Sequence, residues 1–319
     1  MAERETAPNP PFILDTHSDT LWATGARGMD WAETAVTPER LAAGGVTVQT
    51  FALWTGPKGN RGDVAGTVRA ELAARAQWEA AGVRQVADPA EAVGSGKPCF
   101  MLSVEGGEVF EPGLETVAEY KALGVRMAAI LWNNENALGF SAKSGEKRGL
   151  KPYGLAVVRE MQREGMGVDV SHLNEAGFWD ILEKTDIPPL ASHSCCKALC
   201  GHARNLTDDQ LRALIEKGGY VGVNFYPYFL DDAGEADTET ISNHIDHICQ
   251  LGGEGIVGLG SDFDGIEVSP RDLRHPGELG NLFAALRRRG YSEEALAAIA
   301  GGNYLRYDRQ WLTDRGSCR

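Results

Sequence analysis

FILDTHSDT, residues 12–20, is the stretch on which the interpretation of this sequence depends. A short apolar run from Phe12 to Leu14 reaches Asp15 and is followed at once by polar side chains, among them His17 and Asp19. Seven more short apolar runs with polar ends follow along the chain. They are VTVQTFAL (46–53), PCFMLSV (98–104), RMAAIL (126–131), GVDV (167–170), PLAS (189–192), YVGVNF (220–225) and IVGLGS (256–261).

These runs have the character of parallel strands, because they are nearly continuous in apolar residues, as expected for strands buried on both faces. They start on average about 35 residues apart, the length of one strand–helix repeat. Helix signals fill the gaps: Thr207 and Gln210 form a capping box, and Asn174 and Ser292 are expected helix caps. The sequence therefore predicts a single (β/α)8 barrel over residues 1–319, with a flexible segment at residues 1–11.

The alternative arrangement of alternating strands and helices is an open, doubly wound sheet. Such a sheet commonly carries a glycine-rich phosphate-binding loop after a strand. Neither GxGxxG nor GxxxxGK[ST] occurs in this sequence, which weakens the prediction of a nucleotide-binding fold.

Composition excludes several classes of partner. The net charge of −14 argues against binding of nucleic acid or of an anionic membrane surface. No apolar run approaches the ~18 residues of a membrane helix, and the first residues lack the apolar core of a secretory signal. Six cysteines among 319 residues are expected to be reduced thiols, which favours a cytoplasmic location.

Histidines and carboxylates gather at the predicted strand ends, where the active site of such a barrel lies. His17 and Asp19 are two residues apart in an extended segment, so both side chains can reach one ion. Glu105, His172 and His193 follow other strands. Three histidines and two carboxylates exceed one tetrahedral site and favour two metal ions that share a carboxylate. The alternative for His17 and Asp19 alone is a buried histidine hydrogen-bonded to an aspartate.

Other polar and aromatic residues at the strand ends are candidates for catalysis and substrate binding. Asp262 is expected to be a general acid/base near the metals, or else a carboxylate that caps a loop. Arg204 is expected to hold a substrate carboxylate, or else to form a surface ion pair. Trp132 and Tyr226 could wall a pocket or close the barrel rim. Asp264 is expected to serve a turn.

A second group of possible metal ligands lies within ten residues: His193, Cys195, Cys196, Cys200 and His202. The spacing lacks the paired CxxC motifs of a structural zinc site, and buried reduced cysteines are common. A structural zinc is therefore not favoured there. His244 and His247 lie three residues apart and are expected to line a helix face.

Six motifs in order resemble the membrane (renal) dipeptidase family of metallopeptidases. They are DTHSDT (15–20), SVEGGE (103–108), DVSHL (169–173), ASHS with HARN (191–194 and 202–205), VNFY (223–226) and GSDFDG (260–265). The resemblance extends from about residue 12 to about residue 306. It implies a distorted barrel, two zinc ions and the hydrolysis of dipeptides, with a D-residue allowed on the C-terminal side.

The resemblance also implies a role for each residue. His17 and Asp19 would bind the first zinc, His172 and His193 would bind the second, and Glu105 would bridge both. Asp262 would be the acid/base that exchanges a proton with a bridging hydroxide and with the leaving amine, and Arg204 would hold the substrate carboxylate. Trp132 stands where mammalian members have a histidine, and its ring N–H can donate one hydrogen bond but cannot bind a metal. The resemblance further suggests a homodimer.

Two other functions remain open on the residues alone. One is a different dinuclear-metal hydrolase of the same barrel type, which acts on a cyclic amide, an ester or an N-acyl amino acid. The other is a metal-containing binding protein that has lost turnover.

Overall fold

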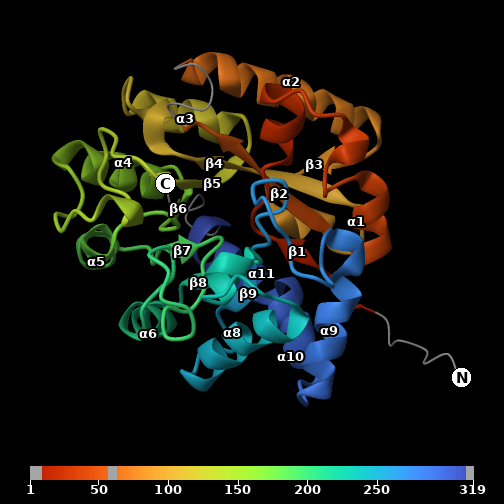
Figure 1. Ribbon diagram of the computed structural model, residues 1–319. Coiled ribbons are helices and arrows are strands. Elements are labelled where there is room, and N and C mark those ends of the chain that lie inside the picture. Colours follow the sequence, from red (N-terminus) through yellow and green to blue (C-terminus); the bar gives the residue numbers. More distant parts are fainter. Residues whose placement is uncertain (1–8, 57–62, 314–319) are drawn as a thin grey trace, which may run out of the picture.

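A closed barrel of eight parallel strands forms the centre of the computed structural model, which describes residues 9–56 and 63–313 (Figure 1). The strands are β1 (Leu14–Asp15), β2 (Val48–Trp54), β4 (Cys99–Glu105), β5 (Val125–Ala129), β6 (Gly167–Asp169), β7 (Leu190–Ala191), β8 (Tyr220–Val223) and β9 (Val257–Leu259). Each overlaps one of the eight predicted runs. β2 pairs with both β1 and β4, which closes the ring. The predicted barrel is confirmed, and the open sheet is wrong.

A ninth strand, β3 (Arg84–Gln85), lies outside the ring and was not predicted. It pairs with the beginning of β4, at Cys99 and Phe100, while β5 pairs with β4 from Leu102 onward. β3 is two residues long and partly exposed, so it leaves no apolar run in the sequence.

Helices surround the ring (Figure 1). They are α1 (Pro38–Gly44), α2 (Val64–Ala80), α3 (Glu115–Ala122), α4 (Pro152–Arg163), α5 (Glu175–Lys184), α6 (Asp208–Lys217), α7 (Pro227–Leu230), α8 (Thr238–Gln250), α9 (Leu279–Arg288), α10 (Glu293–Ala297) and α11 (Asn303–Asp308). Around the ring, α1 to α6, α8 and α9 follow one another in chain order, whereas α11 lies at the centre of the view in Figure 1. The predicted caps of α5, α6 and α10 are confirmed, including the capping box of Thr207 and Gln210. Among the described residues no helix is both long and apolar enough to cross a membrane.

Glycines in β8 and after β9 allow the strands to approach each other closely at the barrel mouth. A Cβ atom at Gly222 or Gly260 would lie 2.2 or 1.9 Å from the carbonyl oxygen of Ser192. The Thr16 hydroxyl lies in the same place, 2.6 Å from the carbonyl oxygen of Ser192 and 2.7 Å from that of Leu259. The glycine-rich sequence of the last strand therefore brings the ends of β7, β8 and β9 together.

A buried ion pair fastens α11 against the barrel. Arg126 of β5 donates from Nε and from a terminal nitrogen to the two carboxylate oxygens of Asp308, at 2.6 and 2.7 Å. Both side chains are buried. Residues 1–8 of the expected flexible segment lie outside the described residues, whereas Asn9 donates a hydrogen bond to the carbonyl of Gly44.

We predict that Asp308→Asn lowers the free energy of unfolding by about 3–5 kcal/mol, because it leaves the Arg126 guanidinium buried without a counter-charge. Urea denaturation of the purified variant measures this. The double variant Arg126→Met with Asp308→Leu should regain much of the loss. If the double variant is no more stable than Asp308→Asn alone, the ion pair does not explain the effect.

Candidate active site

The five predicted metal ligands meet at the C-terminal ends of the strands. His17 and Asp19 follow β1, Glu105 ends β4, His172 follows β6 and His193 follows β7. The Nε2 atom of His17 lies 3.5 Å from Asp19 Oδ2 and 3.8 Å from Glu105 Oε2. The Nε2 atoms of His172 and His193 lie 2.7 and 3.4 Å from Glu105 Oε1. Residues almost 180 positions apart in the sequence thus converge on one buried carboxylate.

The donor atoms in this cluster fit a cation. Two triads of possible ligand atoms have all their members within 4.8 Å of one another, and both contain His17. One triad adds Glu105 and His193, and the other adds Asp19 and Asp262. The atoms His17 Nε2 and Asp19 Oδ1 are buried and have no hydrogen-bond partner among the described residues. Since buried polar atoms are almost always paired, these orphaned atoms point to a bound ion.

The electrostatics of the cluster lead to the same conclusion. Burial raises the pKa of Glu105 well above its usual range, and the Asp19 carboxylate raises it further. Burial alone would lower the pKa of His17, but the nearby carboxylates, Glu105 first and then Asp19, raise it to about 10. Burial also lowers the pKa of His172 and His193 far below the usual value, which keeps both rings neutral. Neutral imidazoles beside crowded carboxylates are a set of ligands for a divalent metal.

Asp262 lies at the edge of this cluster. It follows β9, and its backbone N–H donates to the carbonyl of His17 at 3.1 Å. Its Oδ1 lies 3.8 Å from His17 Nε2, and its Oδ2 accepts a 2.8 Å hydrogen bond from Asn224. Burial raises its pKa to about 7. A carboxyl group that titrates near neutral pH is suited to general acid/base catalysis.

Two of these side chains depend on an unusual backbone conformation. His172 and Asp262 have φ of 68° and 66°, in the left-handed region. Histidine and aspartate adopt this region more readily than most residues, and such strain is common at functional sites. Asp264 has φ of 66° as well, and its carboxylate accepts from the backbone N–H groups of Ala35 and Val36. Asp264 thus lies in a turn, as predicted, and its carboxylate joins this turn to a distant segment of the chain, which was not predicted.

An aspartate–serine clamp joins the end of β6 to the end of β7. The Oδ1 atom of Asp169 accepts the backbone N–H groups of Ser171 and Ser192 at 2.9 and 3.0 Å. The Ser192 hydroxyl donates to Asp169 Oδ2 and lies 2.7 Å from His193 Nδ1. The residues that follow these serines in sequence are His172 and His193. The clamp thus fixes the positions of two candidate ligands and orients the ring of one.

A second clamp of the same form joins β1 to β9. The Oδ1 atom of Asp15 accepts the backbone N–H groups of His17 and Ser261 at 3.3 and 2.9 Å. The Ser261 hydroxyl donates to Asp15 Oδ2. The residue after Ser261 is Asp262, so this clamp holds a candidate ligand and the candidate acid side by side.

A cavity of about 390 Å³ opens above the cluster. Its floor includes Asp19, Glu105, His172 and Asp262. Its remaining lining residues are Trp22, Trp54, Trp132, Asn133, Lys143, Tyr226, Phe229, Gly265, Ile266 and Glu267. Trp132 and Tyr226 thus line the cavity, which corresponds to the first of the two alternatives given for them. Trp132 packs edge-on against Trp54, with ring centroids 5.1 Å apart.

Arg204 lies beside this cavity and is not one of its lining residues among those the structure describes. It is buried, and its terminal nitrogens donate to the carbonyl of His193 at 3.1 Å and to the Ser194 hydroxyl at 3.4 Å. Its Nε is buried without a partner, and its guanidinium lies 5.5 Å from the ring centroid of Phe229, which lines the cavity. The alternative of a surface ion pair for Arg204 is wrong.

The cysteine-rich segment is structural within the described residues. Cys196 donates its backbone N–H to His244 Nδ1 at 3.0 Å, and His244 Nε2 lies 2.9 Å from the carbonyl of Leu230. Cys195 directs its thiol to the carbonyl of Asn224. No group of possible metal ligands in the described chain includes these cysteines. The five described cysteines are unpaired.

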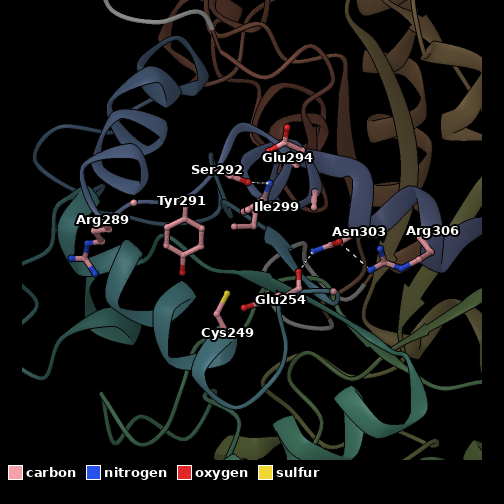
Figure 2. Close-up of a pocket in the computed structure, with 13 residues that line it drawn as sticks. Cys249, Glu254, Arg289, Tyr291, Ser292, Glu294, Ile299, Asn303 and Arg306 are labelled. Carbon is pink, nitrogen blue, oxygen red and sulfur yellow. Dashed lines mark hydrogen bonds between the residues drawn. The ribbon is translucent and has the colours of Figure 1, made fainter.

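A larger cavity, of about 600 Å³, lies apart from the cluster, between the end of α8 and the segment from α9 to α11 (Figure 2). Figure 2 shows Tyr291 and Cys249 within it, with Arg289 and Arg306 near its two ends. Arg289 is paired with Glu239 and Asp246. This cavity contains none of the predicted site residues, so its size alone does not make it the active site.

Sequence reasoning missed the residues that support the ligands. Asn133 lies 3.1 Å from His172 Nδ1, and Asn224 donates to Asp262. Asp15 and Asp169 form the clamps, although both belong to apolar strands. The available signal was their position, because a charged residue within a buried strand needs a partner.

The barrel, the buried cluster of histidines and carboxylates, and the acid beside it define a metal-dependent hydrolase of the (β/α)8 type. The chain belongs to the membrane dipeptidase family, peptidase family M19, whose sequence model matches residues 8–313. The chain is thus a hydrolase that acts on dipeptides, and as a metallopeptidase it depends on a bound metal.

Relatives differ in length from this chain. A protein of Klebsiella pneumoniae encoded upstream of pqqA is 38% identical over 217 residues, which cover 65% of this chain and 80% of that protein. The dipeptidase aclJ of Aspergillus oryzae is 36% identical over 215 residues, which cover 66% of this chain and 51% of that protein. The chain thus spans about half the length of this fungal relative.

Two solved structures share the fold with a TM-score of 0.85 each. One is a metallopeptidase, dipeptidase AC of family M19. It is 26% identical to this chain, and the match covers 97% of this chain and 99% of that one. The other is a metallopeptidase of Rhodobacter sphaeroides bound to a phosphinate mimic of the dipeptide L-Ala-D-Ala. It is 24% identical, and the match covers 95% of this chain and all of that one.

We predict that the metal-free protein becomes less stable as the pH rises from 7 to 8. Folded His17, with a pKa of about 10, keeps its proton, whereas the unfolded chain has lost it above the usual value of 6.5. The folded state therefore binds more protons, and the free energy of unfolding falls by about 1 kcal/mol over this interval. Urea denaturation after chelation measures it. The variant His17→Gln should show a smaller slope, and an equal slope would assign the effect to other groups.

We predict that Ser192→Ala weakens metal binding about 10- to 100-fold, because His193 loses the hydroxyl that orients its ring. Competition with a chromophoric chelator measures the affinity. Ser242→Ala removes a buried hydroxyl of α8, far along the chain from the cluster, and serves as the matched control. Equal affinities in the two variants would show that the clamp does not support the site.

Proposed function

We propose that the protein is a zinc dipeptidase with two zinc ions bridged by Glu105. His17 and Asp19 would hold one ion, and His172 and His193 the other. The observation that carries this proposal is the orientation of the bridging carboxylate. Glu105 directs Oε2 toward His17 and Oε1 toward His172 and His193, so each oxygen faces a different set of ligands.

When bound, the zinc ions would polarise the scissile carbonyl and activate a water molecule as the nucleophile. Asp262 then has two tasks, because a peptide bond breaks only if the leaving amine gains a proton. Its pKa of about 7 lets it accept a proton from the attacking water and release it to the amine nitrogen. The hydrogen bond from Asn224 holds Oδ2 and leaves Oδ1 toward the cluster.

Side chains around the cavity would orient the dipeptide. Arg204 would hold its C-terminal carboxylate, since its Nε lacks a partner and a buried guanidinium gains most from a carboxylate. This requires the guanidinium to turn toward the cavity past Phe229. Trp132 and Tyr226 would pack against the substrate, and the Trp132 ring N–H could donate one hydrogen bond to it. Dipeptides with a D-residue on the C-terminal side would also be accepted, as the family resemblance allows.

The cellular setting that we infer is cytoplasmic, with small dipeptides as partners and neither nucleic acid nor membrane. Buried, unpaired thiols at Cys195 and Cys196 and the net charge of −14 support this inference. A homodimer is proposed from the family resemblance. Sedimentation analysis of the purified protein would test the dimer, and fractionation of the source cells would test the location.

We predict that Asp262→Asn lowers kcat for a neutral dipeptide by about 10²–10⁴-fold, the usual contribution of a general acid/base. Metal content by elemental analysis should remain close to two zinc ions per chain. Chelation of the wild-type enzyme should abolish turnover, and added zinc should restore it. Unchanged kcat in the variant would exclude Asp262 as the acid/base, and a single zinc at full activity would exclude the bridged pair.

A further inference from the structure

The active-site cavity has one cationic side chain whose role the reaction leaves open. Lys143 is the single lysine or arginine among the described residues that line the cavity. It lies in the short helical turn η5 (Ala142–Ser144), in the loop that follows β5. Its ammonium group forms neither a hydrogen bond nor an ion pair within residues 9–56 and 63–313.

The backbone around Lys143 is hydrogen-bonded to the segment that carries His172, one of the candidate metal ligands. Ala142 donates its N–H to the carbonyl of His172 at 2.7 Å, and Ser141 forms an isolated antiparallel bridge with Leu173. Asn174 donates to the carbonyl of Glu146 at 3.0 Å. The loop that carries Lys143 is thus fastened on both sides to the segment that follows β6, and the lysine emerges at the cavity beside His172.

The charges around Lys143 favour an anionic ligand. Lys143 is exposed to solvent, and Ala142, the residue before it, lines a neighbouring pocket together with Arg204, so the two cations belong to adjoining segments. In agreement with this placement, desolvation and the Arg204 cation lower the pKa of Lys143. The Glu267 carboxylate, which also lines the cavity, acts in the opposite direction on the pKa of Lys143 but forms no ion pair with it within the described residues. With Arg204 paired to one substrate carboxylate, Lys143 would still have no hydrogen-bond or ion-pair partner among the described residues, and a second substrate carboxylate could become one.

We propose that Lys143 selects dipeptides whose C-terminal residue carries a carboxylate side chain, aspartate or glutamate. This inference rests on the proposed function, in which Arg204 holds the α-carboxylate of that same residue. A C-terminal aspartate carries its α-carboxylate and its carboxylate side chain on the same Cα atom. The two groups would therefore meet the two neighbouring cations, Arg204 and Lys143. The substrate's α-ammonium group would be repelled by Lys143 and attracted by the carboxylates of the floor, which fixes the orientation of the dipeptide.

The test compares kcat/KM for Ala-Asp with that for Ala-Asn, which is equal in shape and lacks the charge. We expect the wild-type enzyme to prefer Ala-Asp by about tenfold, the contribution of one charge-assisted hydrogen bond. In Lys143→Met the ratio should fall to about one, and in Lys143→Arg it should largely return. Lys97→Met is the control, because Lys97 is an exposed lysine that lines a pocket sharing no residue with the active-site cavity or with the pocket that Arg204 lines.

The outcomes separate this inference from the proposed function. An equal loss for both substrates in Lys143→Met would show that Lys143 binds the α-carboxylate common to all dipeptides, and would overturn the inference. An unchanged ratio would overturn it as well. Hydrolysis of neutral Ala-Asn by the wild-type enzyme tests the proposed function separately, and its absence together with that of Ala-Asp would contradict both.

Discussion

Three carboxylates in one small space, two of them buried and the third partly buried, are the constraint on which the rest of this molecule depends. Asp19, Glu105 and Asp262 all lie within 3.8 Å of His17 Nε2. Burial of several negative charges together is costly unless cations compensate them, so the site stores an unfavourable arrangement that metal binding relieves. The pKa values of His17, Glu105 and Asp262 are raised for the same reason, because each retained proton reduces the negative charge in the cluster.

The barrel maintains this arrangement because polar groups join neighbouring strand ends, and these groups have all their hydrogen-bond partners. In both aspartate–serine clamps, one carboxylate accepts two backbone N–H groups and one hydroxyl. Such fully paired groups tolerate burial, whereas His17 Nε2 and Asp19 Oδ1 in the cluster have no hydrogen-bond partner among the described residues. Gly222 and Gly260 contribute by letting the strand ends approach closely. Rigid supports around unsatisfied ligands are what a preorganised metal site requires.

The sequence was sufficient for the barrel and for the residues at its mouth, because both follow from periodicity. Eight apolar runs, on average about 35 residues apart, specify the strands, and residues after a strand face the same end of the barrel. The position of Arg204 behind the cavity wall was beyond such reasoning, since a residue eleven positions past His193 lies in a loop whose path depends on tertiary contacts such as that between Cys196 and His244. β3 was missed because two half-exposed residues carry no pattern.

Because residue 132 is a tryptophan, one side of the cavity is aromatic, whereas another side is formed by the histidines and carboxylates of the cluster. Trp22, Trp54 and Trp132 form a continuous aromatic wall, with neighbouring ring centroids 5.0 and 5.1 Å apart. The wall ends near His172, whose ring centroid lies 6.3 Å from that of Trp132. A histidine at position 132 would place a polar, titratable ring where this chain has apolar surface. With an apolar ring at position 132, the acid/base role that we propose rests on Asp262, which lines the cavity and has a pKa raised to about 7.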